Sequence, residues 1–143
     1  PGRSLDFFIP SLINAALDGE DFVMSKGDQS WDMLFVEDAV EAMISTAQSS
    51  NINGEIINIG SGQPVSIKAI GNEILRITQS STKLKIGALA QSKGSIPNLV
   101  CNVDKAKQLL NWKSKTSLED GLLKTIDWYR LHRHRFLQGS DHA

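Results

Sequence analysis

The sequence predicts an α/β fold in which helices flank a small set of strands. Apolar residues recur at helical spacing from Phe8 to Leu17, and Gly19 follows as a helix terminator. The apolar run over residues 55–60 is typical of a strand that is buried on both faces. Helix-like and strand-like stretches alternate along the rest of the chain, which is the pattern of α/β proteins.

The remaining elements follow in order from apolar spacing, caps and turns. A short strand over residues 22–25 precedes a turn at 26–28, and a second strand over 31–36 leads into a helix that begins at Glu37. After the strand at 55–60, Ser66 is placed to cap a helix that runs to Ile77. A short strand at 84–86, an extended stretch at 99–101, a helix at 104–110 and a last helix after Ser117 complete the expected elements.

Length and composition predict one ordinary domain. The chain has 143 residues, of which 41% are hydrophobic and 22% charged, so we assign residues 1–136 to a single domain and 137–143 to a frayed polar tail. Because the net charge is −1, nothing favours nucleic acid or an anionic membrane as a partner. No apolar run approaches the roughly 20 residues of a membrane span, and no signal peptide is visible.

The chain contains one cysteine, Cys101, which excludes an internal disulfide. Because there is no second Cys and no Cys/His ligand spacing, a structural zinc site is not expected. A single thiol fits a reducing compartment, so we expect a cytoplasmic location. The sequence begins at Pro1 rather than Met, as expected of a chain whose natural N-terminus is missing, and a tag remnant or a processed chain would begin in the same way.

The Gly60-Ser61-Gly62 turn lies between an expected strand and a capped helix. A phosphate loop starts in this way, since helix N-termini attract anions. Neither a complete G-x-G-x-x-G nor a Walker lysine follows, so a plain strand-to-helix turn is the competing interpretation.

Carboxylates and histidines supply the other candidates for chemistry. Asp32, Glu37 and Asp38 have the residue type of general acids and bases, but Glu37 and Asp38 also stand where first-turn acids stabilise a helix. His132 and His134 are two residues apart and point to different helix faces, which makes them poor joint metal ligands.

The sequence resembles the C-terminal, substrate-binding part of extended short-chain dehydrogenases, the NAD-dependent epimerases and dehydratases that act on nucleotide-diphosphate sugars. The resemblance runs through nearly the whole chain in family order. It rests on Pro1-Gly2, on Phe8-Ile9-Pro10-Ser11-Leu12-Ile13 with Leu17-Asp18-Gly19-Glu20, on Trp31-Asp32 with Leu34-Phe35-Val36-Glu37-Asp38-Ala39, on Glu55 with Ile57-Asn58-Ile59-Gly60-Ser61-Gly62 and Val65-Ser66-Ile67, and on Asp104-Lys105-Ala106 with Leu109-Leu110, Trp112 and Ser117-Leu118-Glu119-Asp120-Gly121-Leu122.

The resemblance implies that the Rossmann core is missing from this chain. The family's glycine-rich turn, which seats NAD, has no counterpart here, nor does its catalytic Tyr-x-x-x-Lys. The only tyrosine, Tyr129, is followed four residues later by Arg133 and is expected to pack in the core. We therefore expect no catalytic residue and no cofactor site in this chain, with NAD bound elsewhere in the intact family.

The resemblance also implies a set of substrate-binding residues. Phe7 and Phe8 match positions near the substrate diphosphate, and residues 22–25, with Phe22, Val23 and Ser25, match the strand that lines the base. Two family arginines that grip phosphate fall at Trp31 and near Ser92, which has Lys93 beside it. Lysine does not reproduce the fork of arginine, so Lys93 is not expected to replace the lost arginine grip on phosphate. Trp31 is expected to stack on a sugar or base, or to pack.

The expected function is that of a nucleotide-sugar-binding fragment which is inactive by itself. Its expected partners are a nucleotide-diphosphate sugar and either the missing N-terminal Rossmann half or a second copy of the chain. The alternative is a non-catalytic, stand-alone binding or oligomerisation module.

Overall fold

The structure, a computed structural model, describes residues 7–50, 52–90 and 96–132, and the chain divides into two compact units. The first consists of Pro1–Gly27, Lys68–Lys93 and Glu119–Ala143, and the second of Asp28–Ile67 and Gly94–Leu118. Each unit contains helices and strands, so the predicted α/β class is confirmed.

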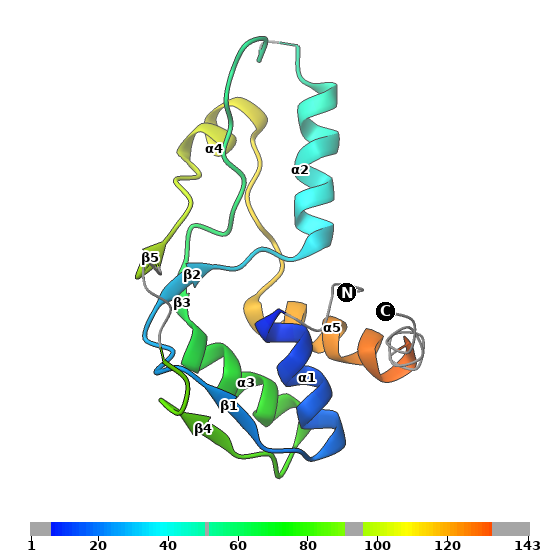
Figure 1. Cartoon of the computed structure of the whole chain (residues 1–143). Coiled ribbons are helices and arrows are strands. Elements are labelled where there is room, and N and C mark those ends of the chain that lie inside the picture. Colours follow the sequence, from blue (N-terminus) through cyan, green and yellow to red (C-terminus); the bar gives the residue numbers. More distant parts are fainter. Residues whose placement is uncertain (1–6, 51, 91–95, 133–143) are drawn as a thin grey trace, which may run out of the picture. The chain divides into compact units, whose positions relative to one another are not determined.

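Three helices and a two-stranded parallel sheet form the first unit (Figure 1). The helices are α1 (Phe8–Asp18), α3 (Ile67–Thr78) and α5 (Leu118–His132), and strand β1 (Phe22–Met24) pairs with β4 (Leu84–Ile86). Fully buried side chains from all three helices make its core, namely Leu12, Ile13, Ile70, Ile74, Ile126 and Tyr129. Tyr129 is thus a core residue, as the sequence predicts.

The second unit holds a three-stranded sheet and two helices. Strand β2 (Ser30–Asp32) lies between β3 (Pro64–Ser66), which is antiparallel to it, and β5 (Asn98–Leu99), which is parallel. Helices α2 (Val36–Gln48) and α4 (Asp104–Leu110) contact each other. The core of this unit is a cluster of Ala42, Ala106, Leu110 and Trp112, against which Leu34, Ile52, Ile57 and Ile59 pack.

The prediction of a strand over residues 55–60 is wrong. This segment forms no strand, and Ile57 and Ile59 pack on the core cluster while Ile56 is exposed. The physical reason is that a strand needs a neighbour for its backbone hydrogen bonds, and this segment pairs with no strand in either sheet of the described chain.

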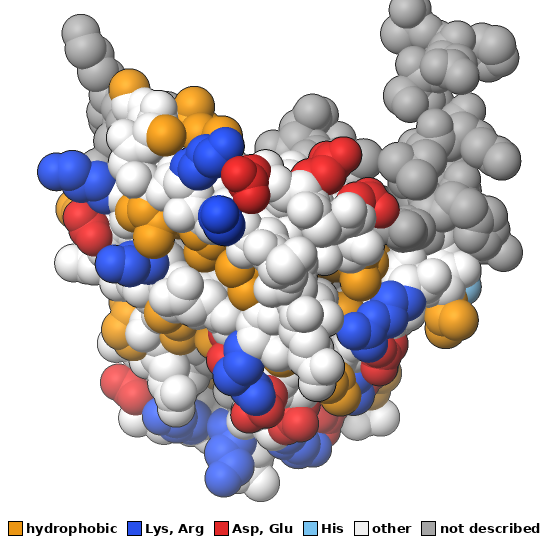
Figure 2. All heavy atoms as spheres, turned by 90° about the horizontal axis from the view of Figure 1, so that it is seen from below, with side chains coloured by type: hydrophobic (Ala, Val, Ile, Leu, Met, Phe, Trp, Pro, Cys, Tyr) orange, Lys and Arg blue, Asp and Glu red, His pale blue; other side chains and the backbone are white. Residues whose placement is uncertain are grey.

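Charged side chains of both signs are interspersed on the face shown in Figure 2. Within the first unit, the guanidinium of Arg76 contacts the carboxylates of Glu73 at 2.6 Å and Glu119 at 2.5 Å, and the ammonium of Lys85 lies 3.0 Å from the Asp21 carboxylate. Arg76 therefore joins α3 to the start of α5. The mixture of signs agrees with the small net charge of the chain.

Candidate functional site

The structure brings part of the predicted substrate-binding set together in the first unit. Phe8, the first residue of α1, and Phe22, the first residue of β1, meet edge to face with ring centroids 5.9 Å apart. Phe7 precedes them at the helix N-cap and is exposed, as is Val23 on β1, whereas Ser25 is half-buried. The start of α1 and the start of β1 thus form one aromatic corner.

The N-terminus of α1 is the positive end of the helix dipole, and its first turn adds no acidic side chain. The N-cap residue Phe7 makes no side-chain capping hydrogen bond, and the first turn contains no acidic residue. Helix ends of this kind favour anions because their backbone N–H groups point outward along the axis. The aromatic corner therefore adjoins a place where a phosphate group is electrostatically favoured.

Strand β1 is held in place by the turn that follows β4. The carbonyl oxygen of Met24 accepts hydrogen bonds from the N–H groups of Gly87 at 2.9 Å and Leu89 at 3.3 Å. Met24 is buried, whereas Val23 points to the opposite face of the strand and is exposed. The strand thus presents Val23 outward from a fixed backbone.

Trp31 belongs to the second unit, where it is the central residue of β2. Its neighbours in the sheet are Val65 and Leu99, and its indole Nε1–H donates to the carbonyl oxygen of Ile96 at 3.3 Å. The polar edge of this side chain therefore fastens the residues that lead into β5. Ser92, the other residue that stands where the family has an arginine, lies outside the described residues, as does Lys93.

The carboxylate of Asp32 is enclosed by donors from two other segments. One oxygen accepts the backbone N–H of Ser61 at 2.8 Å and its hydroxyl at 2.5 Å, and the other accepts the N–H groups of Gly62 at 2.8 Å and Cys101 at 3.2 Å. Burial by itself raises the pKa of Asp32, but these hydrogen bonds outweigh it and hold the pKa below its ordinary value. A carboxylate that stays ionised in this way is a poor general acid. Its hydrogen bonds instead give Asp32 a structural role, because they connect β2 to the Gly60–Gly62 turn and to the segment after β5.

The same hydrogen bonds decide between the two interpretations of the Gly60-Ser61-Gly62 turn. The N–H groups of Ser61 and Gly62, which a phosphate loop would direct at its ligand, donate to Asp32 instead. An anionic pyrophosphate would have to displace a carboxylate that carries the same sign of charge. The use of these two amides by Asp32 agrees with the interpretation as a plain turn.

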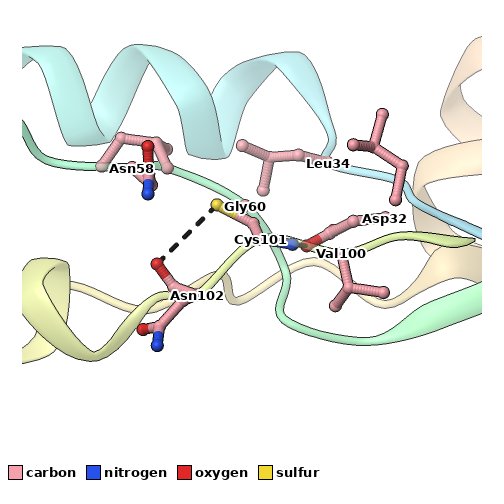
Figure 3. A pocket seen from close by; sticks show the side chains of 9 residues that line it. Asp32, Leu34, Asn58, Gly60, Val100, Cys101 and Asn102 are labelled. Atoms are coloured by element: carbon pink, nitrogen blue, oxygen red, sulfur yellow. Dashed lines mark hydrogen bonds between the residues drawn. The ribbon is translucent and has the colours of Figure 1, made fainter.

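A pocket of about 370 Å³ opens beside Asp32 (Figure 3). In Figure 3 the Asp32 carboxylate points toward Gly60 and Cys101, and the side chains of Asn58 and Asn102 stand at the other end. Its complete lining is Asp32, Leu34, Asn58, Ile59, Gly60, Leu99, Val100, Cys101 and Asn102. Burial, and after it the charge of Asp32, raises the pKa of the Cys101 thiol, which makes it a weak nucleophile.

Asp38 is buried and serves the loop before α5. Its carboxylate accepts the backbone N–H groups of Lys115 at 3.2 Å and Thr116 at 3.0 Å, and the Thr116 hydroxyl at 3.0 Å. The acidic start of α2 therefore has a structural use beyond the helix dipole, which the sequence could not indicate because the partner lies 78 residues away.

Sequence reasoning missed the outward face of α2. The apolar residues Val36, Val40, Met43 and Ile44 are all exposed. Their spacing by four, seven and eight residues was the available signal, but in a lone sequence this spacing indicates a face that turns into the core.

The described part of the chain was also searched for membrane-spanning helices and for metal-binding groups. Within residues 7–50, 52–90 and 96–132, no helix is both long and apolar enough to cross a bilayer. In the same ranges no group of three or more His, Cys, Asp or Glu side chains is arranged to hold a metal ion.

Comparison with known proteins identifies the family. The sequence profile of the family described as GDP-mannose 4,6-dehydratase matches residues 2–125. A UDP-N-acetyl-alpha-D-glucosaminuronate decarboxylase from Bacillus cytotoxicus is 39% identical over 127 residues, which are 85% of this chain and 39% of that protein. A UDP-glucuronate 4-epimerase from Thermodesulfobacterium geofontis is 31% identical over 109 residues, covering 74% of this chain and 32% of the relative.

Solved structures agree with these relatives. The UDP-glucuronic acid 4-epimerase from Bacillus cereus, in complex with UDP-glucuronic acid and NAD, superposes with a TM-score of 0.83 and 26% identity, covering 92% of this chain and 42% of that one. The chain thus spans about two fifths of the length of the relatives it matches. Profile, relatives and superposition together show that this chain belongs to the NAD-dependent nucleotide-sugar epimerase/dehydratase family.

Proposed function

We propose that this chain binds the nucleotide-diphosphate-sugar substrate of an NAD-dependent epimerase or dehydratase. The observation that carries the proposal is the N-terminus of α1, which has no side-chain cap and no first-turn acid and which stands beside the Phe8–Phe22 aromatic pair. A diphosphate and a nucleobase are the two chemical groups that such a corner favours, the first by the helix dipole and the second by aromatic contact.

Each predicted residue receives a part in this proposal. Phe7 and Phe8 lie at the helix end that takes the diphosphate, and Phe22, Val23 and Ser25 lie along the strand that takes the base. Trp31 and Ser92 remain proposed members of the site by family resemblance alone. The hydrogen bond between the Trp31 indole and Ile96 supports a packing role for its polar edge.

NAD and the redox chemistry are assigned to a part of the protein outside these residues. The cofactor supplies hydride transfer when it is bound, and this chain contributes substrate binding and orientation. The proposal draws support from the Gly60–Gly62 turn, whose amides are given to Asp32 and not to a pyrophosphate. It also draws support from the greater length of relatives that bind UDP-glucuronic acid and NAD together.

A pair of substitutions at the helix N-cap tests the diphosphate assignment. Asp and Asn both cap a helix well, and each stabilises it by about 1 kcal/mol relative to an apolar cap. Phe7→Asp and Phe7→Asn therefore differ in charge, while the helix keeps a good cap in both. We expect Phe7→Asn to bind UDP-glucuronic acid, followed by calorimetry, at least tenfold more tightly than Phe7→Asp.

The unfolding temperatures of the two variants show whether a loss of binding comes from unfolding of the chain. If both unfold at the same or a higher temperature than the parent chain, a loss of binding in Phe7→Asp reports repulsion of the diphosphate. Equal affinities of the two variants would refute the placement of the diphosphate at α1.

A further inference from the structure

Asn53 and Gly54 occupy the centre of an exposed turn in the second unit. The N–H of Glu55 donates to the carbonyl oxygen of Ile52 at 3.0 Å, and this hydrogen bond closes the turn. Gly54 has a φ of 78°, a left-handed value that glycine adopts without strain. Both central residues are exposed, whereas Ile52 packs against the core cluster of the unit. The turn is thus open to solvent at its tip and anchored at its base.

The backbone nitrogen of Gly54 is accessible. Among the described residues, no acceptor takes a hydrogen bond from the Gly54 N–H, and none bonds to the side chain of Asn53. A Cβ atom built on Gly54 would meet nothing within 4 Å in the described chain beyond its own sequence neighbours. The side-chain carbonyl carbon of Asn53 belongs to the residue just before this nitrogen. Both reacting groups of an intramolecular cyclisation are therefore uncommitted in the folded chain.

We propose that Asn53 is a site of spontaneous deamidation in the folded chain, with water as the co-reactant. The Gly54 nitrogen gives its proton to a base and forms a bond to Cγ of Asn53, while the side-chain NH2 takes up a proton and leaves as ammonia. Water then opens the cyclic imide at either of its carbonyl carbons. One opening gives aspartate at position 53, and the other gives isoaspartate, in which the main chain runs through the former side chain. Nothing is oxidised or reduced, and the modification is independent of the proposed function.

The other candidate positions lack one of these conditions. Asn53 is the one asparagine in the sequence that is followed by glycine, so at every other asparagine a side chain hinders the attacking nitrogen. Asp18-Gly19 and Asp120-Gly121 have the same spacing of groups. However, Gly19 donates its N–H to the carbonyl oxygen of Ala15, and Gly121 is buried within α5. The structure therefore singles out the 53–54 turn.

The isoaspartyl product loosens the core of the second unit. Its extra main-chain carbon lengthens the turn, so the hydrogen bond between Glu55 and Ile52 is lost. Ile52 is the residue that anchors this turn on the core cluster, and Glu55 forms an ion pair with Lys105 of α4. The new carboxylate also stands two residues before Glu55, so two like charges come close together. A change at the tip of the turn thus affects the packing at its base.

Peptide mapping by mass spectrometry tests the modification. The parent chain, Asn53→Gln and Asn72→Gln are incubated at mildly alkaline pH, each both folded and in urea. Glutamine must form a larger imide ring and reacts more slowly, while Asn72 is an exposed residue of α3 that precedes Glu73 and serves as the matched control. We expect position 53 of the folded parent chain and of Asn72→Gln to deamidate within about tenfold of the rate in urea, because an exposed turn opens locally. Asn53→Gln should be at least about tenfold slower than the parent chain.

Two results would overturn the proposal. If the reaction required global unfolding, the folded chain would deamidate at least about a thousandfold more slowly than the chain in urea. Faster deamidation at another asparagine of the folded chain would exclude Asn53 as the preferred site.

The effect on the core is measured on the isoaspartate-containing fraction of the aged chain. The reference is Asn53→Asp, which carries the new charge on a normal backbone. We expect the isoaspartyl fraction to unfold at a lower temperature than Asn53→Asp. Equal unfolding temperatures would show that the turn does not hold Ile52 on the core cluster.

Discussion

The carboxylate of Asp32 lies 2.8 Å from the backbone nitrogen of Gly62, and this contact joins the middle strand of the three-stranded sheet to a turn thirty residues away. The Ser61 and Cys101 backbone amides complete the arrangement. A polar residue at the end of a short strand thus organises three segments of the second unit.

Replacing Asp32 by Asn is expected to destabilise the chain. The variant loses the charge in a set of hydrogen bonds that are worth about 1.5–3 kcal/mol each when one partner is ionised, and an amide cannot accept with both ends. Urea unfolding should show the loss as a lower midpoint with an unchanged slope. Asp28→Asn, at an exposed site, is the matched control and should leave the midpoint where it is.

The stabilisation by Asp32 is expected to depend on pH. Its folded-state pKa is lowered, so its contribution is complete above the unfolded pKa of about 3.9 and is lost as the pH falls through the folded value. The difference in unfolding free energy between the parent chain and Asp32→Asn should therefore be constant near neutral pH and shrink in acid. A difference that stays constant through the acid range would show that the carboxylate charge is not what stabilises the contact.

Gly60 is expected to tolerate no side chain. A Cβ atom built on it overlaps the Cβ of Cys101 and comes within 2.7 Å of an Asp32 carboxylate oxygen. Gly60→Ala should cost about 1–3 kcal/mol, the usual range for overpacking a close contact. Adding Cys101→Gly removes one of the two clashes, so the double variant should recover part of the loss. Independent, additive effects of the two substitutions would contradict this packing.

The elements that could be predicted are those whose signals are local. Helix α4 has the predicted bounds, Asp104 to Leu110. Helix α1 ends at Asp18 and is capped by Gly19, the predicted terminator, whose φ of 72° is the left-handed conformation that glycine adopts readily. The features that could not be predicted depend on distant partners. They include β3, which exists because β2 lies beside it, the clamp around Asp32, and the absence of a strand at residues 55–60.

The outward face of α2 is expected to make the chain self-associate as its concentration rises. Exposed Met43 and Ile44 give neighbouring molecules an apolar surface to bury. Met43→Glu should reduce the average mass in light scattering across a dilution series, whereas Leu131→Glu, which changes an equally exposed apolar residue on α5, should not. A monomer of 15.7 kDa at every concentration of the parent chain would contradict this expectation.

The central claim is that this chain holds the sugar nucleotide and leaves NAD to another part of the protein. The most direct measurement is a pair of titrations of the isotope-labelled chain, one with UDP-glucuronic acid and one with NAD, followed through the backbone amide signals. We predict saturable shifts with the sugar nucleotide that cluster at the start of α1 and along β1, and no saturable shift with NAD. Shifts that cluster elsewhere or never appear at millimolar sugar nucleotide, or saturable NAD binding at micromolar concentration, would contradict the account.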